Sequence, residues 1–324
     1  MTRVLSYNIL VGGTGRVNQL TQIIKSVSPD VIGLVEATNT HVVETLAERL
    51  GMQYRMSGNP RHLVDWQVAL LSRLPIVSTQ VHARPGRLTK PVLEVCVEEA
   101  NGRLLSVFVA HLSAAFYRGW AGDGIRRREV GEILRFVKVK QGTPHLLIGD
   151  FNALAPHDRL KGGTLLRYLV EMDRRHAERP KDSVGHPYLD FVVPAPLRIL
   201  DPLLRTIPRS KLLCTLFDQA STFYAPHGSI RLLRNAGYVD CFRHMHPLEE
   251  GFTCPAAAPA GRIDYIFASP DLAEYLSACR VITAIDSLCV DEASDHLPVV
   301  AEFGEGVTIE DPKDSQERED VEVY

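Results

Sequence analysis

Short apolar runs alternate along the chain with stretches of helical periodicity. Val4–Leu10 and Asp30–Ala37 have the length and β-branched content of buried strands. Between them, apolar residues recur every three or four positions and stop at Ser28-Pro29, which predicts a helix containing Val17, Leu20, Ile23, Ile24 and Val27. The same spacing predicts a second helix, capped at its C-terminus by Gly51, which contains Val42, Val43, Leu46 and Leu50.

Further strands follow, and two of them form a predicted hairpin. Trp66–Val77 indicates a strand interrupted by Pro75. Val92–Glu99 and Arg103–Leu112 flank Asn101-Gly102, a dipeptide typical of hairpin turns. The remaining pattern predicts an amphipathic helix at Ile125–Val139, a strand running into a loop at His145–Leu154, and strands at Arg262–Ser269 and Leu297–Phe303. Because helices and strands interleave and one strand pair is antiparallel, we expect an α/β sandwich of two packed sheets flanked by helices, not a purely parallel doubly wound sheet.

Two segments depart from this pattern. Residues 156–229 are rich in proline and arginine and show little periodicity outside a predicted helix at Thr164–Ala177. Such a long loop is unusual in a compact domain, so we expect an insertion that forms a wall or lid over one end of the sandwich. Residues 305–324 hold eight acidic and two basic residues, which predicts a flexible acidic tail. The expected catalytic domain is therefore residues 1–304.

Composition and charge narrow the class of protein. The 45% hydrophobic and 23% charged fractions are typical of a globular protein. The net charge of the chain is −3, and residues 305–324 alone contribute −6. Residues 1–304 therefore carry a net charge of +3, which suits an anionic substrate. The first residues lack a secretory pattern, and no run approaches the roughly 20 apolar residues of a membrane span. Six scattered cysteines without a CxxC pair favour reduced thiols in a cytoplasmic protein.

Polar residues stand at the ends of six strand-like segments. Taken singly, each is more often a solvated charge, a satisfied histidine or a turn residue than a catalytic group. Together they have no evident structural purpose, and side chains at sheet ends can converge at one rim. The set comprises Asn8, Glu36, His111, Asp150, Asn152, Asp264, Asp295 and His296.

Metal-assisted hydrolysis of a phosphoester requires groups of these types. A hard cation such as Mg²⁺ takes oxygen ligands, and Glu36 and Asp295 suit that task with Asn8 beside them. The attacking water needs a base and a positioning group, which Asp150 and Asn152 supply.

Two histidines complete the chemistry. His111 and His296 can stabilise the charge that develops on the phosphoryl oxygens. A histidine used in this way is commonly oriented by a carboxylate on its other ring nitrogen, and Asp264 can do this for His296.

The ordered motifs YN, E, HL, GDFN, RIDYIF and SDHLPV resemble the endonuclease/exonuclease/phosphatase superfamily over about residues 1–304. The resemblance implies a four-layer α/β sandwich with a site at one rim and a divalent metal, Mg²⁺ or Mn²⁺. It assigns Glu36 to the metal, places Asn8 and Asp295 near it, gives Asp150 and Asn152 to water and phosphate, and pairs Asp264 with His296. The general base stays open between Asp150 and the Asp264–His296 pair.

Departures from the family pattern bear on the substrate. His111 stands where abasic-site nucleases carry a tyrosine, which is more similar to the sphingomyelinase, deadenylase and tyrosyl-DNA phosphodiesterase branches. Arg126 lies in a run of three arginines on a predicted helix and is a candidate phosphate ligand, although such runs are usually solvated. Tyr117 and Trp120 are candidates to stack on a base or cover an apolar substrate group, with loop anchoring as the alternative.

Three functions are compatible with these observations. The first is a phosphodiesterase or phosphatase acting on a small or lipid-like phosphoester, and the second is a DNA or RNA nuclease. The third is a catalytically inactive binding module, which the presence of Glu36, Asp150 and His296 disfavours. The expected partner is thus a phosphoester, nucleic acid included, and the sequence leaves the oligomeric state open.

Overall fold

Two six-stranded sheets form the centre of the molecule. The computed structural model describes residues 1–58, 67–140, 142–177, 193, 195–285 and 288–304. The first sheet has the order β11 (Leu276–Val281), β12 (Val299–Phe303), β1 (Thr2–Asn8), β2 (Val31–Val35), β4 (Val68–Ser72) and β3 (Gln53–Met56). The second has the order β5 (Ile76–His82), β6 (Val92–Glu98), β7 (Leu104–His111), β8 (His145–Asp150), β10 (Asp264–Ala268) and β9 (Val239–Asp240).

Each sheet is mixed but mainly antiparallel. The pairs β1–β2 and β7–β8 are parallel, and the other neighbouring strands of both sheets pair antiparallel. The hairpin predicted from Asn101-Gly102 joins β6 to β7. The α/β sandwich predicted from the sequence is confirmed, with both sheets of the predicted type.

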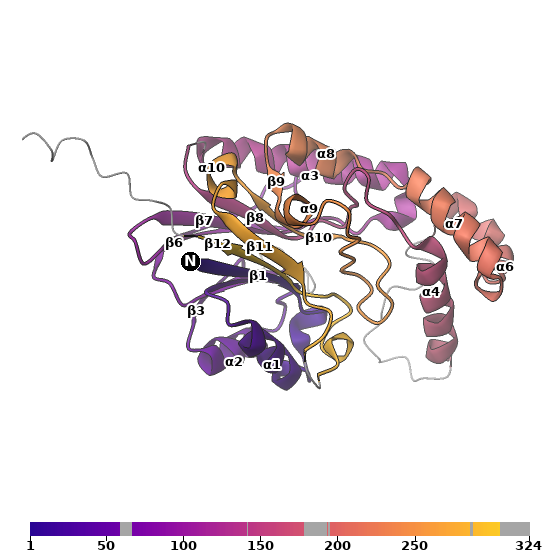
Figure 1. Cartoon of the computed structure of the whole chain (residues 1–324), viewed down its shortest axis with the longest axis horizontal. Coiled ribbons are helices and arrows are strands. Elements are labelled where there is room, and N and C mark those ends of the chain that lie inside the picture. Colours follow the sequence, from indigo (N-terminus) through magenta and orange to yellow (C-terminus); the bar gives the residue numbers. More distant parts are fainter. Residues whose placement is uncertain (59–66, 141, 178–192, 194, 286–287, 305–324) are drawn as a thin grey trace, which may run out of the picture.

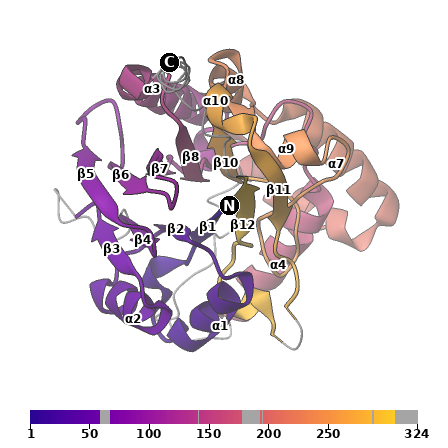
Figure 2. The same cartoon turned by 60° about the vertical axis from the view of Figure 1, so that its left-hand side comes forward.

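Helices cover the outer face of each sheet, which gives four layers (Figure 2). Helices α1 (Val17–Val27) and α2 (Thr40–Leu50) pack on the first sheet, and α3 (Trp120–Val137) and α8 (Gly228–Asn235) pack on the second. Gly51 caps α2 in the left-handed conformation, as its position predicts. The shorter helices are η1 (Val11–Gly13), η2 (Phe116–Arg118), η3 (Lys138–Lys140), α9 (Cys241–Met245), α10 (Pro270–Ala273) and η6 (Val290–Glu292).

The central core lies between the two sheets. In β1, Val4 points into this core while Leu5 packs under the helices, so both faces of the strand are buried. This explains why its sequence is continuously apolar and does not alternate with polar residues. Gly33 of β2 faces Ile148 of β8, and a Cβ at position 33 would lie 2.5 Å from the Ile148 side chain. The two sheets therefore meet closely beneath the ends of β1, β2 and β8.

Two elements differ from the sequence prediction. The single strand expected at Trp66–Val77 is two strands in different sheets, because the chain leaves β4 after Ser72 and enters β5 after Pro75. Trp66 itself lies outside the described residues. Helix α3 begins five residues earlier than the apolar periodicity starts, whereas β8 ends at Asp150 and runs into a loop as expected.

In the part of the expected insertion that the structure describes, five helical elements precede α8 (Figure 1). These are α4 (Gly162–Ala177), which matches the predicted helix, and η4 (Ala195–Leu200), α6 (Asp201–Leu204), η5 (Ile207–Arg209) and α7 (Lys211–Tyr224). They lie beyond the right-hand end of the sheets in Figure 1, whereas the N-terminus marks the opposite end of β1. The acidic tail, residues 305–324, lies outside the described residues. Among the helices that the structure describes, none combines the length and apolar character of a membrane span.

Candidate active site

Strand directions bring the predicted polar residues to one edge of the second sheet. His111 ends β7 and is the register partner of Asp150, the last residue of the parallel strand β8. Asp264 opens the antiparallel strand β10 and is also paired in register with Asp150. All three side chains are buried, with Asp150 in the middle. The ends of three strands therefore hold these groups on a rigid backbone.

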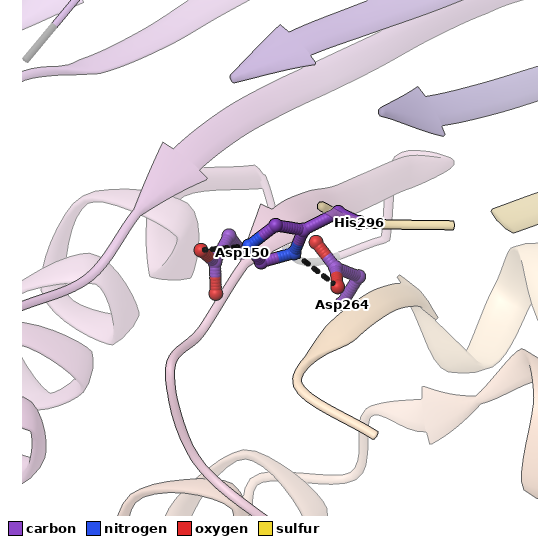
Figure 3. Close-up of side chains that lie close together, drawn as sticks. All are labelled: Asp150, Asp264 and His296. Atoms are coloured by element: carbon purple, nitrogen blue, oxygen red, sulfur yellow. Dashed lines mark hydrogen bonds and ion pairs between the residues drawn. The ribbon is translucent and has the colours of Figure 1, made fainter. Parts of the chain in front are cut away.

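His296 lies between two carboxylates (Figure 3). Its Nδ1 is 2.8 Å from Asp264 Oδ2, and its Nε2 is 3.9 Å from Asp150 Oδ2. A carboxylate on one ring nitrogen fixes the orientation of an imidazole and directs the other nitrogen. Asp264 therefore directs Nε2 of His296 towards Asp150, which also has His111 Nε2 at 3.6 Å.

Asn8 connects the first sheet to this group. Its Nδ2 lies 3.2 Å from Asp150 Oδ2 and 3.2 Å from Glu36 Oε1. Its Oδ1 accepts a hydrogen bond of 3.0 Å from the Leu10 backbone N–H. The amide nitrogen, and not the oxygen, thus faces the carboxylates, and Asn8 holds Glu36 next to Asp150 as a hydrogen-bond donor.

Left-handed backbone conformations accompany the site residues. Glu36, directly after β2, has φ 58°, and Asn152, two residues after β8, has φ 47°. Such conformations are unfavourable for residues with a Cβ and tend to persist at functional sites. Here the Glu36 carboxylate accepts the Val11 backbone N–H at 2.8 Å, while Asn152 donates its own N–H to Asp150 Oδ1 at 2.8 Å. The turn at Glu36 directs its side chain into the site, whereas the Asn152 side chain donates its Nδ2 to the Leu112 carbonyl at 3.1 Å.

Burial and neighbouring charges shift the pKa values of the central groups. Burial, reinforced by the negative charge of Asp264, raises the pKa of the Asp150 carboxyl to about 7. Burial alone would lower the pKa of His296, but Asp264, Cys254 and Asp295 together outweigh it and raise this pKa well above its usual value. For His111, burial followed by the nearby Lys90 lowers the pKa well below its usual value. The pKa values of the two histidines beside Asp150 are therefore shifted in opposite directions.

The site offers several hard oxygen donors. One ligand atom from each of Asp150, Asp264 and His296 lies within 4.8 Å of the others. Because Nδ1 of His296 is hydrogen-bonded to Asp264, this pair is better suited to proton handling than to joint coordination of a cation. Asp295, with Oδ1 at 4.0 Å from His296 Nε2, adds a further carboxylate at the same edge.

The three candidate substrate-binding residues have different surroundings. Arg126 is buried, donates to the Ser113 backbone carbonyl at 3.2 Å and lies over the Phe116 ring, so it supports the loop that follows His111. Its neighbours in the arginine run are exposed. Trp120 is exposed and packs edge-on against Tyr224 at the end of α7. The side chain of Tyr117 lies outside the described part of the structure.

Some supporting residues were not found from the sequence. Ser294 donates its hydroxyl to the Asn8 carbonyl at 2.7 Å and accepts the His296 backbone N–H at 3.2 Å. Ser294 directly precedes Asp295-His296, so its position in that motif could have identified it as a supporting residue. Lys90 donates to the Leu112 carbonyl beside the site and has no comparable sequence signal, because it approaches from a loop far away along the chain.

The buried His296–Asp264 pair and the carboxylate of Asp150 meet at the rim of a double-sheet sandwich. Fold and site together define a hydrolase that acts on phosphoesters. The chain belongs to the endonuclease/exonuclease/phosphatase family, whose sequence profile matches residues 5–296. Members of this family are generally dependent on a divalent metal, and the cluster of Asp150, Asp264 and His296 is consistent with that. No curated protein matches the chain significantly in sequence.

Solved structures of low sequence identity share the fold. A Neisseria 3′ phosphatase bound to a product DNA hairpin has a TM-score of 0.61 at 16% identity, with 94% of this chain and 100% of that chain covered. An AP endonuclease from Archaeoglobus fulgidus has a TM-score of 0.56 at 17% identity, with 94% and 99% covered. A mannosyl-6-phosphatase from Bacteroides thetaiotaomicron has a TM-score of 0.59 at 15% identity, with 94% and 100% covered.

Proposed function

We propose that this protein cleaves a phosphodiester or phosphomonoester with Mg²⁺ or Mn²⁺ by in-line attack of an activated water. The observation that carries the proposal is the chain of contacts from Glu36 through Asn8 to Asp150 and from there to His296 and Asp264. It joins a carboxylate suited to a cation with a buried acid–base group. Phosphoryl transfer needs both elements, because its catalysis consists mainly of positioning and charge stabilisation.

Asp150 is the proposed base. Its Oδ1 accepts the Asn152 N–H and its Oδ2 accepts the Asn8 amide N–H, and each oxygen keeps a second lone pair. Oδ2, which lies nearest His296 Nε2, is the atom proposed to take a proton from the water. Asp264 keeps His296 Nε2 directed at the same place, where the imidazole donates a hydrogen bond to a phosphoryl oxygen. His111, whose Nε2 lies 3.6 Å from Asp150 Oδ2, helps to stabilise the same negative charge on the phosphoryl oxygens.

Glu36 and Asp295 are the proposed metal-holding residues, with Asn8 as their positioning donor. Their carboxylate oxygens are the ligand type that Mg²⁺ and Mn²⁺ prefer. When bound, the cation would neutralise charge on the phosphoryl group. Hydrogen bonds from the Val11 N–H to Oε2 and from Asn8 Nδ2 to Oε1 hold the Glu36 carboxylate in place, and each oxygen keeps a lone pair for the cation.

A soluble aryl phosphodiester tests the proposal. We expect hydrolysis with Mg²⁺ or Mn²⁺, none in EDTA, and a loss of about 10²–10⁴-fold for Asp150→Asn, which removes the base. Asp271→Asn, an exposed aspartate on α10, is the matched control and stays fully active. Activity in EDTA, or an Asp150→Asn protein with normal activity, would refute the assignment.

A nuclease is the second candidate. The exposed Trp120–Tyr224 pair beside the site favours it, since aromatic side chains can stack on unpaired bases. Plasmid nicking that falls steeply with added salt would support this activity over cleavage of a small phosphoester.

The six cysteines are free thiols, which favours a reducing compartment. We therefore propose that the protein acts in the cytoplasm.

A further inference from the structure

The insertion carries an apolar surface that nothing in the described structure covers. In α7, no residue is fully buried, and the side chains of Leu212, Leu216 and Phe223 are 69%, 53% and 91% exposed. At about 100° per residue, these three positions fall within about 40° of one another on the helix. They lie on one side of the helix, with Gln219 between Leu216 and Phe223, and are here called the α7 stripe.

The α7 stripe lies on the side of α7 opposite to α4. The α4-facing side carries Phe217 and Ser221, which lie against Gly162, and Asp218, which accepts the Gly163 N–H at 2.7 Å. On the turns that precede α7, Ile199, Leu200 and Leu203 are also exposed. A solvent-facing helix normally has the reverse pattern, with charged residues outward. Exposed apolar surface of this kind marks an interaction site.

The charges around the stripe are basic. Arg209 and Lys211 are exposed directly before α7 and at its first residue. The two acids of residues 195–224 are engaged, since Asp201 pairs with Arg205 at 2.8 Å and Asp218 holds α4. A helix with leucine and phenylalanine on one face and basic residues beside it is typical of binding in the plane of an anionic lipid surface.

This surface is joined to the catalytic edge. Tyr224 at the end of α7 contacts Trp120, which opens α3 after the His111 loop. Thr222 of α7 accepts the Leu160 N–H at 2.9 Å, and Leu160 lies on the segment that leaves the site after Asn152. The insertion that carries the stripe therefore contacts the segments that leave the catalytic edge, and it lies beyond the same end of the sheets (Figure 1).

We propose that residues 195–224 dock on the surface of an anionic lipid bilayer, and that the phosphoester cleaved by the adjoining site belongs to a membrane lipid. The substrate part rests on the proposed function, whereas the docking part does not. A second copy of this chain is a less suitable occupant, because a symmetric contact would bring Arg209 and Lys211 of both copies together. Nucleic acid is also less suitable, because its contacts use basic and aromatic groups and leave exposed leucines unused.

Vesicle flotation of the full chain tests docking. We expect the protein to float with vesicles of phosphatidylcholine and phosphatidylserine and much less with phosphatidylcholine alone. The variant Leu212→Ser/Leu216→Ser/Phe223→Ser should lose at least about tenfold in vesicle affinity at unchanged unfolding temperature. The matched control, Val77→Ser/Leu104→Ser/Val139→Ser, removes exposed apolar side chains elsewhere and should bind as the wild type does.

Several results would overturn docking. The first is that the protein floats with neither vesicle, and the second is that the stripe variant floats as well as the wild type. The third is that the wild type binds no vesicle but forms a dimer, and that the stripe variant is a monomer. Salt-sensitive binding to a DNA duplex in the absence of vesicle binding would do the same. Hydrolysis of the soluble aryl phosphodiester separates this failure from that of the proposed function, because it needs the site but no lipid. If the aryl ester is cleaved and vesicles bind but no phosphate or headgroup is released from phospholipid vesicles, the substrate part is wrong.

Discussion

His296 and Asp264 are joined by a hydrogen bond of 2.8 Å that connects the start of β10 to the segment before β12, and so bridges the two sheets. The bond lies on the Nδ1 side of the ring, opposite the nitrogen that faces Asp150. A substitution of Asp264 should therefore alter the orientation and charge of the His296 ring without removing any group on the Nε2 side, where we propose that the substrate binds.

Asp264→Asn tests this relationship. The amide has the same shape but cannot stabilise a protonated imidazole, so we expect kcat for the aryl phosphodiester to fall by about 10²–10⁴-fold while KM changes little. Steady-state kinetics at saturating Mn²⁺ measures both. The exposed Asp271→Asn serves as the control, and a normal kcat in Asp264→Asn would remove the pair from the reaction.

Glu36→Gln tests the metal assignment by a readout other than activity. Replacing a charged oxygen ligand with an amide should weaken Mn²⁺ binding at least about tenfold, measured by titration calorimetry. Glu274→Gln changes an exposed glutamate in the same chemical way and should leave the affinity unchanged. Equal Mn²⁺ affinity in both variants contradicts a role for Glu36 in holding the ion.

Gly149→Ala tests how the backbone positions Asp150. Gly149 has φ 134°, and a Cβ there would lie 1.9 Å from the Ala110 carbonyl oxygen on β7. Accommodating it requires the two strands to separate, so we expect a destabilisation of about 1–3 kcal/mol in urea unfolding, with reduced activity. Gly124→Ala in α3 meets open space and should be neutral or stabilising by up to about 1 kcal/mol. Equal stabilities for the two variants would disprove the close approach.

Glu94 predicts an acid limit to stability. Burial alone would raise the pKa of this carboxyl, but hydrogen bonds from His82 and Lys140 outweigh it and lower the pKa. A lowered pKa means that the stabilisation is present above the unfolded value of about 4.3 and is lost as the pH falls through the folded value. The unfolding free energy should therefore decrease with acid more steeply in the wild type than in Glu94→Gln. Exposed Glu98→Gln should follow the wild type, and parallel curves for all three proteins would contradict the prediction.

Local pattern was sufficient for most of the fold. The spacing of Val17 to Val27 and the Asn101-Gly102 turn each determine a local structure by themselves, and both elements lie where they were predicted. The assignment of Trp66–Val77 to one strand was wrong, because β4 and β5 lie in different sheets. An apolar run has the same sequence pattern whether it stays in one sheet or crosses from one sheet to the other. The only local sign of that change was Pro75, which cannot donate to a strand ladder.

The candidate site was predictable as a set of residue types, but its internal contacts were not. Motif order identified Asn8, Asp150 and His296, whereas the orientation of the Asn8 amide depends on the Leu10 N–H and a turn with positive φ. The inward direction of Arg126 among three arginines likewise depends on how α3 is rotated against the second sheet. Such rotations are set by packing between distant segments, which a single sequence does not display.

The bond between Asn8 and Asp150 has a consequence for how the protein becomes active. Asn8 comes from one sheet and Asp150 from the other, and their strands are separated by more than a hundred residues. Neither sheet alone carries all the residues that we propose for catalysis, so we expect activity only once the two sheets have packed together. Turnover of substrate during refolding would thus report the final joining of the sheets, a step that secondary-structure signals do not distinguish.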